Sequence, residues 1–185
     1  PTVAQPGDVA DWSVSWQTST RTIGAVLGKT AEAEALVAKV EKAFADTRKA
    51  HPAFAGKKAQ VLSSWGWPNT FYAYSSQDAR GRLLTGLGFQ SVAEFDTLAG
   101  NSFGVSVSRE RLNLADIDAV IWMTSGPAEE KALKADPVWT KLKAAKEGRE
   151  LFLPEDHVLY SAFNFASVLS LPFALEGLAP ALEKA

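Results

Sequence analysis

Apolar residues recur at three- and four-residue steps over residues 30–50, which predicts a long amphipathic helix with charged residues on its other face. The apolar positions are Leu36, Val37, Val40 and Phe44. We expect His51-Pro52 to end this helix, because a proline disfavours helical backbone at the residue before it. A weaker apolar pattern before it predicts a helix that Asp11 or Ser13 caps and that ends near Gly28, after a loop over residues 1–10.

After Gly56 the pattern changes to short apolar runs that alternate with helical segments. The runs predict strands over residues 57–65, 118–124 and 149–154. Helices are predicted over residues 78–89, where Asp78 is the candidate cap, over 106–116, over 127–148 with a break at Asp136-Pro137, and near the end of 161–185. Strands that alternate with helices predict an α/β fold with a mostly parallel sheet.

Composition places the chain among folded globular proteins and excludes several classes of function. Hydrophobic residues make up 46% of the 185 residues, and the net charge of −2 supplies no general field for nucleic acid or anionic membranes. The absence of cysteine excludes disulfides and thiolate metal sites. Because the chain begins at Pro1 rather than Met, we expect it to be a piece of a longer protein.

Residues that would carry catalysis are sparse. The only two histidines, His51 and His157, fall in different predicted connections, and no nucleophile elbow, phosphate-binding loop or dinucleotide-binding turn is present. The acidic pairs at 129–130 and 155–156 are expected at helix starts or in solvated loops, where a carboxylate favours the helix dipole. The sequence therefore predicts no catalytic residues and no protein-bound metal.

The most distinctive stretch is VLSSWGWPNTFYAYSS, residues 61–76, which places five aromatic rings where a strand gives way to turn-forming residues. Ligands in open α/β sheets bind beyond the carboxyl ends of strands, so Trp65, Trp67, Tyr72 and Tyr74 are candidate ligand-binding residues. Rigid amphipathic rings suit a bulky, partly apolar ligand. The alternative is that some of these rings close the end of the core.

Four segments give the chain a resemblance to the substrate-binding proteins of iron-siderophore, haem and cobalamin ABC importers. These segments are WSVSWQTSTRTIGAVLGKTAEAEALVAKVEKAF, GRLLTGLGF, VSRERLNLADIDAVIW and DPVWTKLKAAKEGRELFLP. The first is similar to the stretch in which a short helix and a turn lead into the long helix between two lobes. The others resemble, in order, segments of the second lobe.

The resemblance implies the class III substrate-binding-protein architecture, in which a rigid helix joins two α/β lobes and the ligand lies between them. It assigns residues 1–29 to the end of a first lobe and a lead-in helix, 30–55 to the connecting helix, and 56–185 to the carboxyl-terminal lobe. That lobe is expected to have three layers, with a mostly parallel sheet flanked by helices. An amino-terminal lobe and a secretion signal are expected to precede this segment.

The resemblance also implies roles for individual residues. Trp65 and Trp67 match the ligand-facing loop after the first strand of the lobe, and Tyr72 and Tyr74 extend it. A second group follows the last predicted strand, with closure of the core as the alternative role: Tyr160, Phe163 and Asn164.

Three charged residues complete the implied set. Arg80 and Arg82 are candidate partners for an anionic ferric complex, or they lie on an exposed helix surface. Glu110 matches the glutamate with which each lobe docks an arginine of the membrane permease; alternatively, it is a favourable charge near a helix start.

The resemblance therefore implies an extracytoplasmic protein, either periplasmic or a cell-surface lipoprotein, that captures a ferric siderophore and delivers it to an ABC permease. The chelator, and not the protein, would hold the iron, and no cofactor is expected. Haem or cobalamin is an alternative ligand for the same fold. A tetrapyrrole chelatase-like enzyme, with His157 and Glu155 as candidates, and a purely structural interaction domain are alternatives from other classes.

Overall fold

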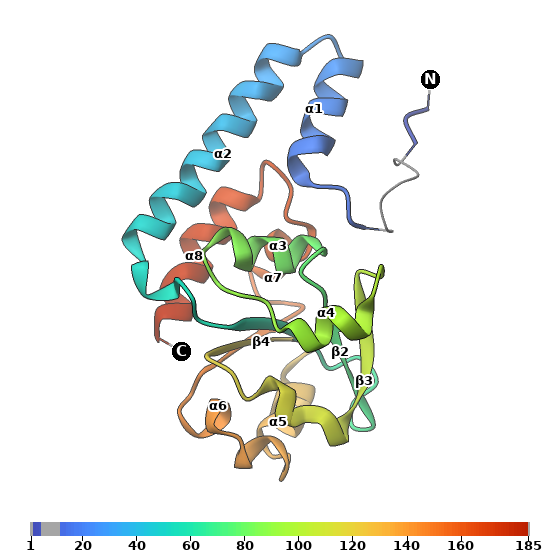
Figure 1. Ribbon diagram of the computed structural model, residues 1–185, viewed down its shortest axis with the longest axis vertical. Coiled ribbons are helices and arrows are strands. Elements are labelled where there is room, and N and C mark those ends of the chain that lie inside the picture. The colour runs from blue at the N-terminus through green and yellow to red at the C-terminus, as the bar shows by residue number, and fades with distance from the viewer. Residues whose placement is uncertain (1, 5–11, 185) are drawn as a thin grey trace.

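Two helices project as a hairpin from one end of the molecule (Figure 1). The computed structural model describes residues 2–4 and 12–184. Helix α1 (Trp16–Val26) is followed by α2 (Thr30–Ala50), and Gly28 takes the left-handed backbone conformation between them with a φ of 68°. Ser15 caps α1 by accepting a hydrogen bond from the Thr18 N–H at 3.1 Å. The prediction of Ser13 as this cap is therefore wrong, and Asp11 lies outside the described residues.

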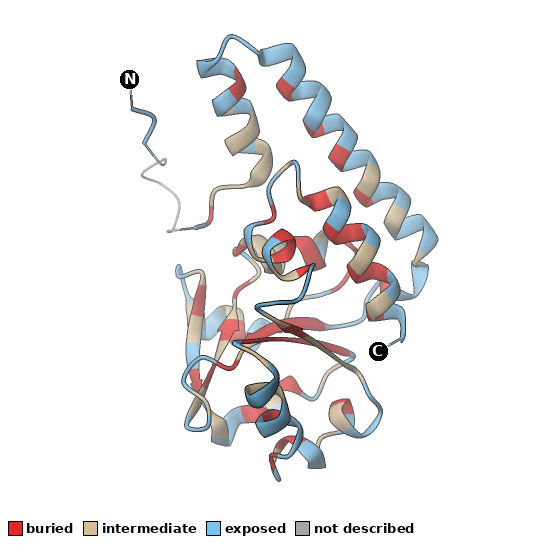
Figure 2. Cartoon of the chain, turned by 180° about the vertical axis from the view of Figure 1, so that it is seen from behind, coloured by how far each residue is buried: buried red, intermediate tan, exposed pale blue. Residues whose placement is uncertain are grey.

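The long helix α2 follows the apolar pattern of its sequence. Its buried positions are Ala33, Val37, Val40 and Phe44, which form one stripe along the helix (Figure 2). Leu36 lies beside this stripe and remains exposed. After α2 a short 3-10 helix, η1 (Pro52–Phe54), leads into the sheet. The lower half of α2 packs against the carboxyl-terminal helix α8 (Leu171–Lys184), so the hairpin is anchored at its base.

In the described part of the chain, five strands form one sheet in the order β3-β2-β1-β4-β5. The strands are β1 (Ala59–Ser63), β2 (Thr70–Tyr74), β3 (Gly104–Ser108), β4 (Ala119–Thr124) and β5 (Glu150–Pro154). Strands β1, β4 and β5 pair in parallel, while β2 is antiparallel to both β1 and β3. Four of the five strands therefore point the same way, which confirms the predicted mostly parallel α/β sheet.

Helices cover both faces of the sheet, and this arrangement has three layers (Figure 1). The helices that pack on one face are α2, α3 (Ala79–Gly86), α7 (Tyr160–Phe165) and α8. The elements on the other face are α4 (Ala93–Ala99), the 3-10 helices η2 (Arg109–Ala115) and η3 (Trp139–Lys141), α5 (Pro127–Lys134) and α6 (Lys143–Lys146). All six residues of β4 are buried, because its side chains enter both layers.

Two strands and two α-helices were not predicted from the sequence. Strands β2 and β3 and helices α4 and α7 fall in segments that were interpreted as turns or left unassigned. The helix predicted over residues 106–116 is wrong at its start, since residues 106–108 belong to β3 and the 3-10 helix η2 follows. The predicted break at Asp136-Pro137 is confirmed by the end of α5 at Lys134.

Asp136 holds this break in place. Its carboxylate accepts the N–H groups of Val138 and Trp139 at 2.8 and 3.1 Å, and the Arg109 guanidinium donates to it at 2.7 Å. Burial alone would raise the pKa of Asp136, but these hydrogen bonds outweigh it and bring the pKa below its ordinary value. The Trp139 ring is thereby fixed at 5.3 Å from Trp122, edge to face, inside the second layer.

Candidate functional site

A row of four aromatic rings lies on the side of the sheet that strands β2 and β3 form. Trp65 follows β1, Tyr72 and Tyr74 belong to β2, and Phe103 precedes β3. The centroid of the Tyr72 ring lies 5.6 Å from that of Trp65, 5.1 Å from Tyr74 and 5.8 Å from Phe103. The Trp65 side chain is 71% exposed and the other three are partly exposed. We call these four residues the aromatic wall.

The alternation of β2 explains why two tyrosines belong to this wall. Side chains of successive strand residues point to opposite faces, so Phe71 and Ala73 enter the core layer that contains Trp122, while Tyr72 and Tyr74 point to the other face. There Tyr74 packs at the edge of the other core layer, and both tyrosines keep part of their surface exposed. Tyr74 is further held because its carbonyl accepts the Gln60 side-chain amide at 2.6 Å. The wall is thus built on rigid strand backbone.

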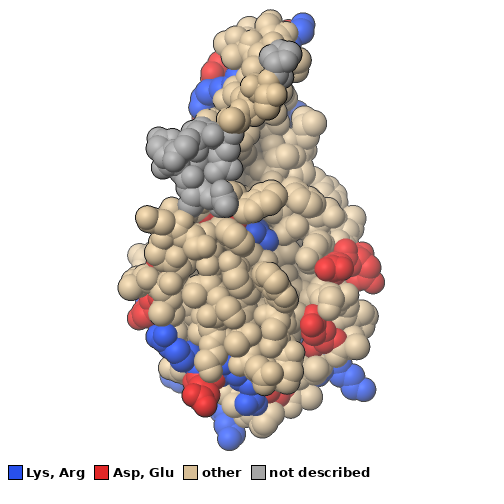
Figure 3. Space-filling model, turned by 90° about the vertical axis from the view of Figure 1, so that its right-hand side faces the viewer, with Lys and Arg blue, Asp and Glu red and all other residues tan. Residues whose placement is uncertain are grey.

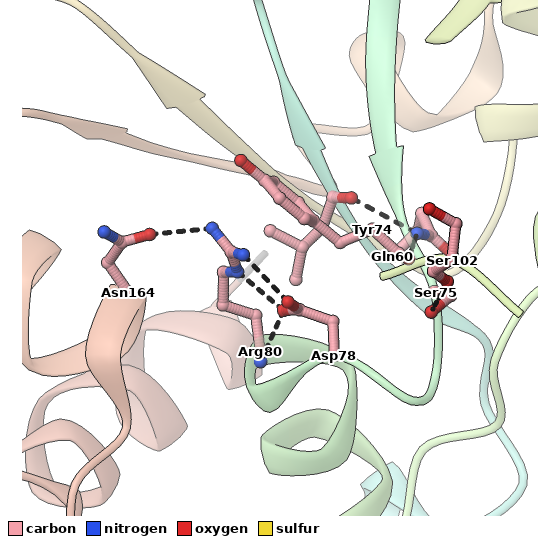
Figure 4. A network of polar contacts seen from close by, with 8 residues as sticks. Gln60, Tyr74, Ser75, Asp78, Arg80, Ser102 and Asn164 are labelled. Carbon is pink, nitrogen blue, oxygen red and sulfur yellow. Dashed lines mark hydrogen bonds and ion pairs between the residues drawn. The ribbon is translucent and has the colours of Figure 1, made fainter. Parts of the chain in front are cut away.

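Arg80 is locked beside the aromatic wall by three partners (Figure 4). Its Nε and Nη2 donate to the Asp78 carboxylate at 2.6 and 2.8 Å, and its Nη1 donates to Asn164 Oδ1 at 2.7 Å. The guanidinium carbon also lies 3.5 Å from the centre of the Tyr74 ring. Burial opposes the charge on Arg80, but Asp78 outweighs it and the pKa rises above its ordinary value.

Asp78 also caps the amino-terminal end of α3. It accepts the Arg80 N–H at 2.9 Å, which confirms the cap predicted from the sequence. Only 1% of Asp78 is exposed. One carboxylate therefore fixes both the start of a helix and the position of a guanidinium.

A hollow of about 280 Å³ opens beyond the carboxyl ends of the parallel strands. Its lining comes from the ends of β1 and β4, from the start of α5 and from the segment after β5: Ser63, Ser64, Trp65, Gly66, Trp67, Met123, Thr124, Ser125, Glu129, Glu155 and Tyr160. Trp65 belongs to both the hollow and the aromatic wall, so the two features form one surface. Tyr160 has a raised pKa, caused first by burial and then by the charge of Glu155.

Glu129, one of the two carboxylates that line the hollow, is fixed by hydrogen bonds. One of its oxygens, Oε2, accepts hydrogen bonds from the hydroxyl of Ser64 and from the Ser125 hydroxyl and N–H, the latter two at 2.8 Å. Burial would raise its pKa, but these hydrogen bonds outweigh it and lower the pKa of Glu129 below its ordinary value. The carboxylate is therefore ionised at neutral pH.

The structure brings five of the predicted ligand-binding residues together in one region and places Tyr160 in the adjoining hollow. The five are Trp65, Tyr72, Tyr74, Arg80 and Asn164. Phe103 was missed by the sequence analysis, because only the pairing of β3 with β2 carries it to Tyr72.

Two other predicted ligand-binding residues, Trp67 and Phe163, are not part of the aromatic wall. Trp67 lines the hollow, but its ring also packs edge to face on buried Trp122 at 6.1 Å, with Arg109 6.0 Å from its centre. Phe163 has no exposed surface and packs in the core, which is the alternative role given for it from the sequence. Its side chain is therefore not part of the surface wall.

The remaining charged candidates, Arg82 and Glu110, belong neither to the aromatic wall nor to the lining of the hollow. Arg82 donates to the Ser13 carbonyl at 2.7 Å, and burial lowers its pKa. Glu110 is exposed in the first turn of η2. Because Ser108 pairs with Thr70, at the start of β2, Glu110 lies at the same edge of the sheet as the hollow.

Neither histidine is among the residues that line the hollow. His51 stacks on Phe54, and its Nδ1 is 3.0 Å from Glu183. His157 is exposed, and its Nδ1 accepts the Leu159 N–H at 3.2 Å. Within residues 2–4 and 12–184, no three His, Asp or Glu side chains are grouped so that they could hold a metal ion. Over the same residues, no helix is long and apolar enough to cross a membrane.

Charged groups are sparse on the side of the molecule that carries β2 and β3. Figure 3 shows this side, with Lys, Arg, Asp and Glu gathered mainly around its margin and few of them in the broad central area. Together with the aromatic wall, this surface suits a ligand that presents apolar groups.

This fold, with helices on both faces of a mostly parallel sheet and a long helix leading into it, is that of class III substrate-binding proteins. Residues 1–157 match the model of the family described as periplasmic binding protein, and the chain belongs to that family. This confirms the relationship expected from the sequence. No curated protein matches the chain.

Solved structures of similar proteins show the same fold. A periplasmic solute binding protein from Mycobacterium smegmatis is 28% identical with a TM-score of 0.76, over 91% of this chain and 56% of that one. PiaA from Streptococcus pneumoniae, solved in complex with ferrichrome, is 25% identical with a TM-score of 0.76, over 94% and 60%. FhuD2 from Staphylococcus aureus with bound ferrioxamine B is 18% identical with a TM-score of 0.73, over 92% and 65%. The chain therefore spans less than two thirds of each of these proteins.

Proposed function

We propose that this chain is the carboxyl-terminal lobe, with its connecting helix, of an extracytoplasmic protein that binds a ferric siderophore and delivers it to an ABC permease. The observation that carries the proposal is the aromatic wall beside a hollow at the carboxyl ends of the parallel strands. PiaA, a similar protein, was solved with ferrichrome. The chelator holds the iron, and the protein performs no chemistry on it.

The wall fits the chemistry of such a ligand. Hydroxamate chelates wrap the metal in a shell of amides and methylene groups, and aromatic side chains cover such mixed surfaces well. Trp65 supplies the most exposed ring, while Tyr72 and Tyr74 are held by β2. Because the guanidinium of Arg80 is hydrogen-bonded to Asp78 and Asn164, we propose that this arginine supports the aromatic wall and does not bind the ligand directly.

A second lobe completes the proposal. The hollow of about 280 Å³ lies below the range of about 300–1,000 Å³ typical of ligand pockets, so a bulky chelate needs another wall. An apolar groove of about 520 Å³ also runs between the α1–α2 hairpin and the segment after α7. Large apolar side chains that line it are exposed: Ile23, Leu27, Phe165 and Leu169. We propose that the amino-terminal lobe of the full-length protein covers this groove.

We further propose that Glu110 docks the permease. Its carboxylate is exposed at the same sheet edge as the hollow, so one surface would meet the membrane partner while the adjoining cleft holds the ligand. The protein would then work outside the cytoplasm, in the periplasm or as a surface lipoprotein. The chelatase-like alternative is disfavoured, because neither histidine lies in the hollow.

Tryptophan fluorescence of the full-length protein tests this function. We expect a ferric hydroxamate such as ferrichrome to quench the emission saturably and haem or cobalamin to quench it weakly, and we expect Trp65→Ala to remove most of the quenching. Saturable quenching by haem or cobalamin alone would replace the ligand with the alternative from the same family. No quenching by any of the three, in protein shown to be folded by circular dichroism, would overturn the proposal.

A further inference from the structure

The hollow is lined by acidic groups and by no basic side chain. Glu129 and Glu155 both line it, and no Lys or Arg is among its lining residues in the described part of the chain. Glu129 is ionised at neutral pH, because the hydrogen bonds from Ser64 and Ser125 lower its pKa. A ligand entering the hollow therefore meets negative charge.

The two arginines that the sequence offered as partners for an anionic chelate, Arg80 and Arg82, are engaged elsewhere. The guanidinium of Arg80 is neutralised by the buried Asp78 carboxylate and has all three nitrogens engaged. Arg82 is directed to the Ser13 carbonyl. An anionic chelate would have to break these contacts before it could gain a cation.

Two acceptors of the hollow have hydrogen-bonding capacity to spare. All three hydrogen bonds to Glu129 reach Oε2, and no donor among the described residues reaches Oε1. Thr124 is 2% exposed, lines the same hollow, and its Oγ1 has no hydrogen-bond partner in the described part of the chain. Buried polar atoms in native proteins are usually paired, so an unpaired hydroxyl in the same hollow as an ionised carboxylate indicates a place for a polar group of the ligand.

The chemistry of these acceptors defines the donor. An ammonium group has three N–H donors and a positive charge, so it matches the ionised Glu129 carboxylate and has further donors for a hydroxyl such as that of Thr124. The exposed Trp65 ring at the mouth of the hollow attracts cations through its π face. An anionic or purely acceptor group could take a hydrogen bond from the Thr124 hydroxyl, but it would leave Glu129 Oε1 unsatisfied and would be repelled by that carboxylate.

We infer that the hollow receives a protonated amine carried by the ferric chelate, so that the protein prefers cationic chelates to neutral or anionic ones. This inference rests on the proposed function and names its ligand class. Glu129 supplies the charge-assisted hydrogen bond, Thr124 accepts a second one, and Glu155 adds a longer-range attraction.

A matched pair of ligands tests the inference. In ferrioxamine B three hydroxamate anions neutralise Fe³⁺ and a terminal ammonium leaves one positive charge, whereas its N-acetyl derivative is neutral. A charge-assisted hydrogen bond contributes about 1.5–3 kcal/mol, so we expect the full-length protein to bind ferrioxamine B about tenfold or more tightly than the acetyl derivative. Isothermal titration calorimetry at low and high salt measures this ratio, which should fall as salt rises.

Variants assign the preference to Glu129. In Glu129→Gln the ratio of the two dissociation constants should approach one, while Glu130→Gln should keep it, because Glu130 pairs with Lys134 at 2.6 Å on α5 and does not line the hollow. Thr124→Val should lower the ratio with less effect than Glu129→Gln. If Glu129→Gln does not fold, the ligand comparison in the unmodified protein still tests the inference.

The outcomes separate the inference from the function. Equal affinity for both ligands would overturn the inference and leave the proposed function standing. A preference that Glu129→Gln leaves unchanged would overturn the assignment of Glu129. Failure to bind either ligand would count against the proposed function itself.

Discussion

Removing the Asp78 carboxylate should strongly destabilise the protein, because one buried group serves two structural contacts. Asp78 caps α3 and pairs with the guanidinium of Arg80, whose side chain is only 12% exposed. Loss of a helix cap costs about 1 kcal/mol, and breaking a buried ion pair by removing one partner costs about 3–5 kcal/mol. Since the two losses overlap, we expect Asp78→Ala to lower the free energy of unfolding by about 3–5 kcal/mol. Asp78→Asn keeps an acceptor for the cap and should recover about 1 kcal/mol of this.

Urea unfolding at neutral pH, followed by tryptophan fluorescence, measures these changes. Asp46→Ala is the matched control, because Asp46 pairs with Lys42 at 2.5 Å on the exposed surface of α2. Such a surface pair contributes about 0–1 kcal/mol. If Asp78→Ala destabilised the protein no more than this control, Arg80 would not be held as we describe. The Arg80 guanidinium would then be available to an anionic ligand.

Three further substitutions test the site, the docking surface and the fold. Trp65→Ala should change the free energy of unfolding by less than about 0.5 kcal/mol, because the ring is mostly exposed, yet weaken chelate binding at least about tenfold in calorimetry; an unchanged dissociation constant would contradict the assigned role. Glu110→Ala in the full-length protein should leave chelate binding intact and impair uptake of the ferric chelate by cells, whereas normal uptake would exclude docking through this residue. Asp136 has a lowered folded-state pKa, so its stabilisation is complete above the ordinary value of 3.8 and is lost as the pH falls through the folded-state pKa. Asp136→Asn should therefore lack this part of the acid dependence in urea unfolding measured at several low pH values, and identical acid dependence in the two proteins would contradict the assignment.

Elements set by local sequence could be predicted well. The stripe of α2, the Asp78 cap and the break at Asp136 each depend on residues within a few positions of one another. Strand β4 was predictable because an uninterrupted apolar run signals a strand buried on both faces. The class of fold followed from these local signals and from the order of the segments.

Strand β2 was missed although its alternation is regular. Residues 70–74 alternate between buried and partly exposed positions, but Gly66, Pro68 and Asn69 directly before them favour turns. What decides that residues 70–74 form a strand is pairing with β1 and β3, and β3 lies about thirty residues further along the chain. Pairing at such separations is not visible in local propensity.

The candidate site shows the same limit. Three residues of the wall, Trp65, Tyr72 and Tyr74, could be proposed because they cluster in sequence, but Phe103 and the polar partners of the site come from distant segments. Asn164 bonds Arg80 across 84 residues, and Ser64 bonds Glu129 across 65. Glu129 was expected to be a solvated helix-start charge, and only the folded structure shows that it lines the hollow.

The structure of the full-length protein with bound ferrioxamine B tests the central claim most directly. The account predicts that the chelate covers the aromatic wall, with its carbon atoms within about 4.5 Å of the rings of Trp65 and Tyr72. Its terminal nitrogen should lie within hydrogen-bonding distance, about 2.7–3.2 Å, of Glu129 Oε1. A chelate bound elsewhere, with both rings facing solvent, would contradict the assignment of this surface as the ligand site.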